Sequence, residues 1–250
     1  MLSKNDIKYV RSLGQSKFRE QFGCFIAEGS KLIAEFYSEG MTFERVYATL
    51  GHQLPAELDI QKVSPAELAR ISQLTNPQDA LAIIPFKRLE APKTADEIGD
   101  LVILCDRLQD PGNLGTIIRT ADWFGVKHVI CSLDTADPYA PKVVQATMGS
   151  LARVSVSKTD LGSFVQKMRA LDCKHKVIAS TLGGQSIYSS KMESQLMLVL
   201  GNESKGVRKE LIGICDTEVT IPGFGGAESL NAAISAAIFM AEFRRINPRK

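Results

Sequence analysis

Three separated segments of this chain hold the glycines and polar side chains that could carry chemistry. Two lie close together in the last third, at 198–207 and 221–234, and each begins with an apolar run that breaks into a glycine-bearing turn. The second turn opens directly into a long amphipathic stretch, as expected for a helix. Backbone N–H groups and side chains converge where a strand leads through a loop into a helix, and α/β proteins bind ligands there. The two segments therefore predict one shared pocket.

The third segment, 110–121, reads Asp-Pro-Gly-Asn-Leu-Gly-Thr-Ile-Ile-Arg-Thr-Ala. It places Asn113 at the start of a predicted helix and Arg119 off the apolar face of that helix. Taken singly, the polar residues of all three segments also have ordinary roles. Asn113 or Ser229 can cap a helix, Arg119 can be solvated and Glu203 can be an exposed loop acid. One residue at a time, the structural and the functional interpretations are about equally supported.

Several common catalytic patterns are missing. The turn after a predicted strand at 101–105 contains no Gly-x-Gly-x-x-Gly, so the fingerprint of a dinucleotide fold is absent. The chain has neither a phosphate-binding Gly-x-x-x-x-Gly-Lys loop nor the Gly-x-Ser-x-Gly of serine hydrolases. Its three histidines and five cysteines do not follow metal-ligand spacing, so we expect no metal site.

Composition sets wider limits. With 250 residues, 44% of them hydrophobic, the chain can form one or two packed domains. The net charge is only +2, but the first 20 residues carry +3 and the last seven carry +4, so the ends are either phosphate-binding or ordinary solvated termini. The cysteines lack CxxC pairs, which indicates free thiols in a reducing compartment. There is no signal-peptide core and no run of about 20 apolar residues, which predicts a soluble cytoplasmic protein without a membrane partner.

The first ~85 residues read as a small α/β unit with its own core. The patterns predict helices at 4–14, at 31–39 and from Ser64, strands at 22–27, 43–49 and 81–84, and an exposed polar loop at 15–21. The stretch 87–99 is poor in large apolar residues and reads as a linker.

The rest of the chain alternates strands and helices. Predicted strands lie at 101–105, 128–132, 176–180, 197–200 and 218–221, and predicted helices at 113–125, 140–149, 160–172 and 229–246. This alternation favours a mostly parallel sheet with helices on both faces.

Taken together and in this order, the three segments resemble the signature motifs of the SpoU (TrmH) family of RNA ribose 2′-O-methyltransferases. Asn113 and Arg119 match the first motif, Gly201-Asn-Glu203 with Gly206 the second, and Ile221-Pro222 with Glu228-Ser-Leu-Asn231 the third. The resemblance covers roughly 100–246, and the leading residues look like the substrate-binding extension of many members. Departures from the family pattern are confined to the pocket loops, at Ser204, Gly223 and Ala232-Ala233.

The resemblance implies an architecture. Residues 1–92 would form a substrate (RNA)-binding α/β domain, followed by a linker to about 99. Residues 100–250 would form an S-adenosylmethionine-dependent methyltransferase domain, a parallel sheet whose C-terminal part makes a deep trefoil knot of the SPOUT type, a rare exception to un-knotted chains. Family members act as homodimers, with the C-terminal helix at the interface and each site completed by the partner.

The implied cofactor is S-adenosylmethionine, held mainly by backbone groups, with apolar side chains against its adenine. By similarity, its binding residues are Thr181, Leu182, Gly183, Leu200, Gly201, Asn202, Gly206, Ile221, Leu230 and Ala233. Recognition by the main chain leaves little side-chain signature, which would explain the missing nucleotide fingerprint.

The resemblance also implies which residues act on RNA. The catalytic set would be Arg119, Asn113, Glu203, Ser229 and Asn231, and the RNA-binding set Lys4, Lys17, Arg19 and Arg119. A guanidinium, with a pKa above about 12, is a poor base. We therefore expect Arg119 to grip the phosphate beside the target ribose, with a phosphate oxygen or a perturbed guanidine accepting the proton.

The expected activity is methyl transfer to a ribose 2′-hydroxyl of structured RNA, with 23S rRNA favoured because a separate N-terminal module suits a large RNA. Two alternatives remain open, a tRNA 2′-O-methyltransferase and a ribosome-associated RNA-binding protein without catalysis. The second would be expected to lose Arg119, Glu203 or Asn231, and all three are present. A dinucleotide-dependent oxidoreductase is less consistent with the sequence, because its glycine fingerprint is absent.

Overall fold

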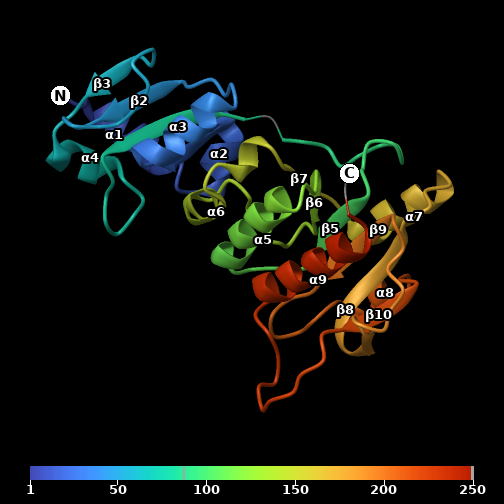
Figure 1. Cartoon of the computed structure of the whole chain (residues 1–250). Helices are drawn as coiled ribbons and strands as arrows, with labels where there is room; N and C mark the ends of the chain where they lie inside the picture. The colour runs from blue at the N-terminus through green and yellow to red at the C-terminus, as the bar shows by residue number, and fades with distance from the viewer. Residues whose placement is uncertain (87, 249–250) are drawn as a thin grey trace. The chain divides into compact units, whose positions relative to one another are not determined.

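The computed structural model describes residues 1–86 and 88–248, which form two compact units (Figure 1). Unit 1 comprises Met1–Arg88 and Asp137–Arg153, and unit 2 comprises Leu89–Ala136 and Val154–Lys250. Residues 137–153 thus pack with the first unit although they lie far along the chain. Whether 1–92 and 100–250 are the functional domains stays a prediction.

Unit 1 is built on a four-stranded sheet in the order β1-β4-β2-β3. β4 pairs antiparallel with β1 and β2, and β3 pairs parallel with β2. The strands are β1 (Cys24–Glu28), β2 (Arg45–Ala48), β3 (Ile60–Lys62) and β4 (Ala80–Pro85), and the helices are α1 (Lys4–Ser12), α2 (Ser16–Phe22), α3 (Ser30–Ser38), α4 (Pro65–Ile71), α6 (Pro141–Thr147) and the short η1 (Ser150–Ala152).

Both faces of this sheet are buried. Successive side chains of a strand point to opposite faces, so Cys24 and Ile26 pack with residues of α1 and α4, whereas Phe25 packs with residues of α3 and α6. Helix α4 begins with a capping box, as Ser64 and Glu67 predicted. The prediction of an exposed loop at 15–21 is wrong, because this stretch forms α2, which ends at Gly23 in a left-handed conformation.

Residues 137–153 complete the second face of that core. The ring of Tyr139 stacks on Phe86 with centroids 3.9 Å apart and lies 5.3 Å from Phe25, and Val144 joins the same cluster. At the edge of this contact, the Asp137 carboxylate accepts two hydrogen bonds from the Arg19 guanidinium.

Unit 2 contains the predicted parallel sheet, which is confirmed. Its six strands run in the order β10-β8-β9-β5-β6-β7, and every neighbouring pair is parallel. The strands are β5 (Leu101–Cys105), β6 (His128–Cys131), β7 (Ser155–Lys158), β8 (Lys176–Ser186), β9 (Leu196–Leu200) and β10 (Thr217–Thr220).

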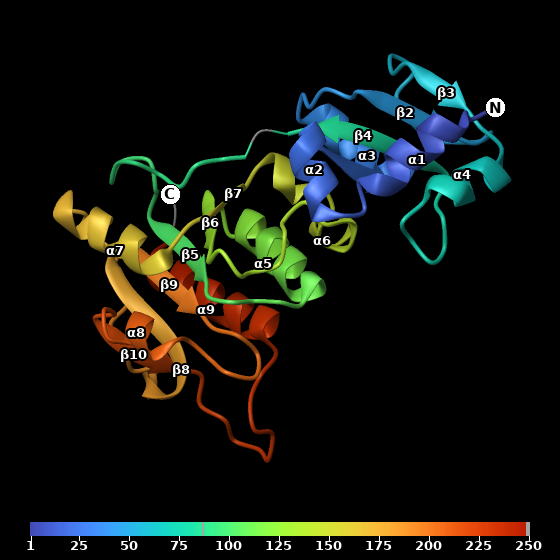
Figure 2. The ribbon, with the colours of Figure 1, turned by 180° about the vertical axis from the view of Figure 1, so that it is seen from behind.

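Helices cover both faces of the sheet, as the alternating pattern indicated. α5 (Pro111–Trp123) and α9 (Ala232–Ile246) lie side by side in both views (Figures 1 and 2). α7 (Leu161–Ala170) and α8 (Lys209–Ile212) contribute to a separate core with alternate residues of the central strands. Within the described part of the chain, no helix has the length and apolar character needed to cross a membrane.

One irregularity in the sheet matters for the site. β8 and β10 pair regularly up to Ala179 opposite Glu218, and the next residue of β10, Val219, then lies opposite Gln185. Five residues of β8, 180–184, therefore bulge out of the ladder between two consecutive residues of its neighbour. Bulges of this kind redirect side chains beside binding sites.

Candidate active site

The two glycine-bearing segments of the last third line one pocket of about 420 Å³ in unit 2. The bulge of β8 supplies its third wall. This volume falls in the range of small-molecule sites, and the lining mixes apolar side chains with backbone groups. The lining residues are Ser180, Thr181, Leu182, Leu200, Gly201, Asn202, Glu203, Ser204, Lys205, Gly206, Val207, Ile212, Glu218, Thr220, Ile221, Glu228, Ser229, Leu230, Ala232 and Ser235.

Most of the predicted cofactor residues lie at this pocket. Eight of the ten line it, and the exceptions are Gly183 and Ala233. Ala233 is buried, and its backbone N–H is used inside the site, where it donates to the Asn231 side chain over 2.9 Å. Ser180, Ile212 and Glu218 also line the pocket but could not be predicted from the sequence, since their positions depend on how the strands and α8 pack.

Two glycines allow the backbone to fold tightly around the pocket. A Cβ on Gly201 would lie 2.2 Å from the carbonyl carbon of Gly206 and from the amide nitrogen of Val207. A Cβ on Gly184 would lie 2.5 Å from backbone atoms of Glu218 and Val219. Real Cβ atoms do not approach backbone this closely, so both positions require glycine for space rather than for an unusual φ.

Thr181, in the bulge, carries a polar atom that the fold leaves unsatisfied. Its hydroxyl oxygen is buried and has no hydrogen-bond partner among the described residues. Buried hydroxyls in native proteins are nearly always paired, so an unpaired one at the wall of a pocket indicates a ligand that supplies the partner.

The loop after β9 is shaped by Asn202. Its side-chain amide donates to the carbonyl of Arg107 over 2.9 Å, and its side-chain oxygen accepts from the N–H groups of Ser204 and Lys205. Its backbone exchanges two hydrogen bonds with Gly206. Asn202 therefore folds the loop that presents Glu203 to the pocket.

A buried ion pair anchors the far end of the same loop. The Asp106 carboxylate is fully buried and accepts hydrogen bonds from the Arg208 side chain, at 2.6 and 2.8 Å, and from the Arg208 backbone. Burial lowers the pKa of Arg208, but its hydrogen bond to Asp106 and the negative charges of Asp106, Asp134 and Asp160 together outweigh burial and raise that pKa above its ordinary value. The sequence analysis missed this pair. An aspartate directly after a buried strand was the available signal.

The three motifs meet in a chain of side-chain hydrogen bonds. The Asn113 amide on α5 donates to a Glu203 carboxylate oxygen over 2.8 Å. The Asn231 amide in turn donates to the Asn113 side-chain oxygen, also over 2.8 Å. The Asn231 oxygen accepts from the backbone N–H groups of Ala233 and Ile234, so both ends of each amide are used. Asn113 is thereby joined in one polar array to Glu203, 90 positions away in sequence, and to Asn231, 118 positions away.

The helix caps differ from the sequence interpretation. Asp110 caps α5 and accepts from the Asn113 N–H, so Asn113 lies within the first turn rather than at the cap. Asn231 is the cap of α9, and Ser229 lies before the helix as an exposed residue lining the pocket. Asn113 and Ser229 are therefore free of the capping roles that would have explained them.

Arg119 is separate from this array. It is exposed on α5, and its guanidinium has no hydrogen bond or ion pair with any residue the structure describes. It lies six residues after Asn113, which at 3.6 residues per turn puts the two side chains on different faces of the helix. The structure does not bring Arg119 together with Glu203 or Asn231 of the same chain.

The predicted RNA-binding residues of unit 1 divide into two groups. Lys4 and Lys17 are exposed. Arg19 is only 3% exposed, and its guanidinium binds Asp137 and the Leu13 carbonyl. The charge of Arg19 is thus used inside unit 1, and we do not carry it forward as an RNA contact.

Comparison with known proteins agrees with this arrangement. Residues 4–82 match the model of the MRM3-like substrate binding domain. The chain is 30% identical over 245 residues to the 23S rRNA (guanosine(2553)-2′-O)-methyltransferase RlmP of Bacillus subtilis, covering 95% of each chain. It is 26% identical to the 23S rRNA (guanosine-2′-O-)-methyltransferase RlmB of Vibrio cholerae, over 85% of this chain and 88% of the relative.

Comparison with solved structures also finds an rRNA methyltransferase. The crystal structure of an AdoMet-bound rRNA methyltransferase from Sinorhizobium meliloti superposes with a TM-score of 0.83 at 30% identity, covering 98% of this chain and 97% of that one. Residues 100–241, more than half of the chain, match the model of the SpoU rRNA methylase family. The motif residues, the parallel sheet and these matches establish that the chain belongs to the SpoU rRNA methylase family.

Proposed function

We propose that this protein transfers a methyl group from S-adenosylmethionine to a ribose 2′-hydroxyl of structured RNA, and that its substrate is 23S rRNA. The observation that carries the proposal is the array of Asn113, Glu203 and Asn231, because one polar residue from each motif meets the others beside a small-molecule pocket. The two relatives described above, which match 95% and 85% of this chain, are named as 23S rRNA 2′-O-methyltransferases, which favours rRNA over tRNA.

The pocket fits the cofactor. Leu200, Ile221 and Leu230 offer apolar surface to an adenine ring, and the loop around Gly201 offers main-chain groups to its edge. The unpaired Thr181 hydroxyl provides a hydrogen-bonding group that protein atoms leave unused. When bound, S-adenosylmethionine supplies a methyl group on a sulfonium centre, a cationic leaving group that needs little acid assistance.

The protein's own residues then have to bind and orient the ribose. The array fixes the Glu203 carboxylate and the Asn113 amide, while Ser229 presents a hydroxyl to the same pocket. Such fixed groups align a 2′-hydroxyl for displacement and account for much of the rate. Arg119 would hold the phosphate beside the target ribose bidentately, so that a phosphate oxygen could accept the proton of the attacking hydroxyl.

The C-terminal part of unit 2 forms a deep trefoil knot in this proposal. The match of residues 100–241 to the SpoU rRNA methylase family supports it, because the resemblance to that family implies the knot. A crystallographic trace of residues 176–246 is the direct check.

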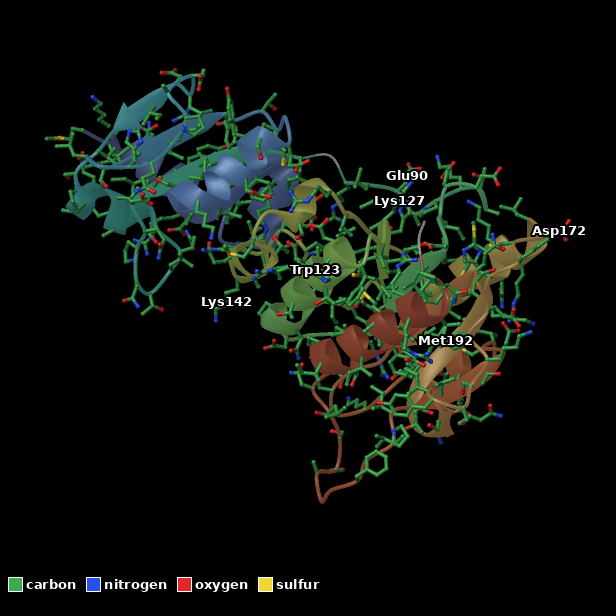
Figure 3. The ribbon with its side chains drawn as sticks, in the orientation of Figure 1. Glu90, Trp123, Lys127, Lys142, Asp172 and Met192 are labelled. Carbon is green, nitrogen blue, oxygen red and sulfur yellow. The ribbon has the colours of Figure 1, made fainter. Side chains whose placement is uncertain are left out.

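The active form is a homodimer in which Arg119 completes the partner's site. Exposed apolar side chains on α5, on α9 and in the loop before α9 support this. Trp123, labelled in Figure 3, is 86% exposed, Ile234 is 52% exposed and Leu230 is 47% exposed. Arg119 shares the exposed side of α5 with Trp123, four residues on. A second copy covering this surface would bury the apolar side chains and place Arg119 away from its own array.

The first test is the reaction itself. Labelled methyl transfer from S-adenosylmethionine is measured with unmodified 23S rRNA, with tRNA and with assembly intermediates of the large ribosomal subunit, and the label is located after nuclease digestion. We expect label on the ribose of 23S rRNA. Label on tRNA alone would reassign the substrate. Cofactor binding without transfer to any of the three RNAs would favour an RNA-binding protein without catalysis.

Mixing two inactive variants tests the partner's contribution. Arg119→Ala and Asn231→Ala should each lose turnover while still binding S-adenosylmethionine. In a two-fold dimer, a mixed pair has one site with both residues intact, so unfolding and refolding the two together should restore about a quarter of the wild-type rate. If Arg119 serves its own chain, the mixture stays inactive. A monomer by light scattering would also contradict the arrangement.

A further inference from the structure

Unit 1 carries a cluster of aromatic side chains that its core does not use. Tyr9 on α1 packs edge-on against Phe22, with ring centroids 5.0 Å apart, and Phe18 lies nearly parallel to Phe22 at 6.3 Å. Phe22 is 43% exposed, and Tyr9 and Phe18 are half-buried. The three rings belong to neither face of the sheet core, apart from partial packing of Tyr9. We call these three residues the Phe22 patch.

Positive charge lies directly on the Phe22 patch. The Lys17 ammonium stands 5.9 Å from the centre of the Phe18 ring, and the Arg45 guanidinium stands 5.6 Å from the centre of the Tyr9 ring. Within the described chain, Lys17 has no carboxylate partner. A cation beside an exposed ring can bind a phosphate while the ring stacks on the attached base.

The charges around the patch favour an anion. Four exposed cations on α1 and α2 have no acidic partner among the described residues, namely Lys4, Lys8, Arg11 and Lys17. The acids of the two helices are already neutralised, because Asp6 pairs with Arg45 at 2.6 Å and Glu20 pairs with Arg88. One further acid lies at the patch, because Glu44 accepts a hydrogen bond from the Tyr9 hydroxyl over 3.0 Å and lies 3.7 Å from Arg45. The four unpaired cations still leave this surface with net positive charge, and Lys17 lies beside the rings.

We propose that the Phe22 patch binds an unpaired segment of the RNA substrate, with a base stacked on Phe22 and the adjacent phosphate held by Lys17. The inference rests on the proposed function and assigns it a specific contact surface. A polyanion with planar, unstacked bases matches both properties of the patch, whereas duplex RNA hides its base faces. An acidic protein would match the positive charge of the patch, but it carries no unstacked bases that could stack on the exposed rings.

Fluorescence anisotropy of the full-length protein tests the contact without requiring methyl transfer. The probes are a labelled oligouridine of about 12 nucleotides and a duplex RNA of the same length. Phe22→Leu keeps the apolar volume and removes the ring, and Phe22→Tyr keeps the ring. We expect Phe22→Leu to weaken oligouridine binding at least about fivefold, the lower end for loss of one stacked base, and to leave duplex binding unchanged. Phe22→Tyr should bind as wild type.

Salt dependence separates the ring from the cation. Each phosphate contact on a single strand contributes roughly 0.7 to the slope of log affinity against log salt. Lys17→Gln should reduce that slope by about this amount, whereas Phe22→Leu should lower affinity at every salt concentration with the slope unchanged. Leu50→Ala, which removes an 87%-exposed apolar side chain just beyond the opposite end of β2 from Arg45, is the matched control and should change neither.

The outcomes distinguish this inference from the proposed activity. If Phe22→Leu binds oligouridine as tightly as wild type, or if it loses binding together with thermal stability, the rings only hold α1 against α2 and the inference is overturned. A change in oligomeric mass with no change in RNA affinity would likewise overturn it and assign the rings to a protein contact. Failure of methyl transfer by the wild-type protein would count against the activity alone, since binding is measured separately.

Discussion

At the scale of single residues, the site depends on asparagine side chains whose amide oxygen and nitrogen have different hydrogen-bond partners. The Asn231 oxygen caps α9, and its nitrogen donates to Asn113. The Asn113 side-chain nitrogen in turn donates a hydrogen bond to the Glu203 carboxylate. The residue types could be chosen from the sequence, because three motifs in order are specific. Their pairing could not, since it depends on the packing of α5 against α9 and on the loop after β9.

Replacing Asn231 separates these two roles. Asn231→Asp keeps a side-chain oxygen at the cap and removes the donor to Asn113, so thermal stability should stay near wild type while turnover falls about a hundredfold through lost alignment. Asn231→Ala should lose turnover and also about 1 kcal/mol of stability with the cap. Calorimetry and single-turnover methyl transfer measure the two effects. Equal turnover in Asn231→Asp and wild type would mean that the array does not orient the site.

At the scale of elements, the sequence predicted most strands of unit 2 but not the shape of β8. The expected strand 176–180 is the regular part, and the continuation to Ser186 contains the bulge that forms a pocket wall. Residues 180–184 have no strand pattern of their own, so the bulge is imposed by pairing with β10. β3 and β7 were also missed, because their sequences, Ile-Gln-Lys and Ser-Val-Ser-Lys, each contain only one apolar residue.

Helix α2 was not predicted from the sequence for a different reason. Its polar and basic sequence suggested an exposed loop, yet Arg19 is buried and binds Asp137, more than a hundred residues away. The available local signal was Gly23, a left-handed helix end.

The glycine at the tightest turn gives a prediction at this scale. Gly201→Ala would place a Cβ 2.2 Å from backbone atoms of Gly206 and Val207, so the loop after β9 must move. We expect a loss of about 1–3 kcal/mol in unfolding free energy and no detectable binding of S-adenosylmethionine by isothermal titration. The control is Gly225→Ala, where an added Cβ meets no atom within 4 Å. Wild-type cofactor affinity in Gly201→Ala would show that the loop does not shape the pocket.

At the scale of the whole molecule, the compact units do not follow the order of the chain. The sequence indicated an N-terminal α/β unit, and that unit exists, but residues 137–153 complete it. No local pattern records this, because the contacts of Tyr139, Val144 and Asp137 are all long-range. The attachment of residues 137–153 to unit 1 therefore depends on tertiary contacts. One of them, the ion pair of Arg19 with Asp137, can be measured by mutation.

The Arg19–Asp137 pair makes a prediction for stability and pH. Burial raises the pKa of Asp137, but hydrogen bonds from Arg19 and the Tyr139 backbone outweigh it, so the net pKa lies below the ordinary 3.8. A carboxyl group whose pKa is lower in the folded than in the unfolded protein stabilises the fold at any pH above its unfolded-state pKa. This contribution is lost as the pH falls through the folded-state pKa. Arg19→Met should therefore cost about 2–4 kcal/mol at pH 7 and flatten the acid limb of the stability curve.

Denaturant titrations between pH 3 and pH 7 measure both effects. Arg88→Met removes an ion pair whose partners are 62% and 50% exposed, and as the matched control it should cost less than about 1 kcal/mol. If Arg19→Met and Arg88→Met behave alike, the buried pair does not hold residues 137–153 in place.

The return of the chain to unit 1 at 137–153 has a consequence for synthesis. The polypeptide leaves unit 1 after Arg88 and supplies its last piece only when residue 153 has been made. At roughly 5–20 residues per second, a ribosome needs several seconds for that interval. During this time Phe25 and Phe86 lack their cover, and the nascent chain is exposed to misassociation. When residue 153 has been made, only β5 and β6 of the six strands of unit 2 precede it, so the two units are completed over overlapping intervals rather than strictly one after the other.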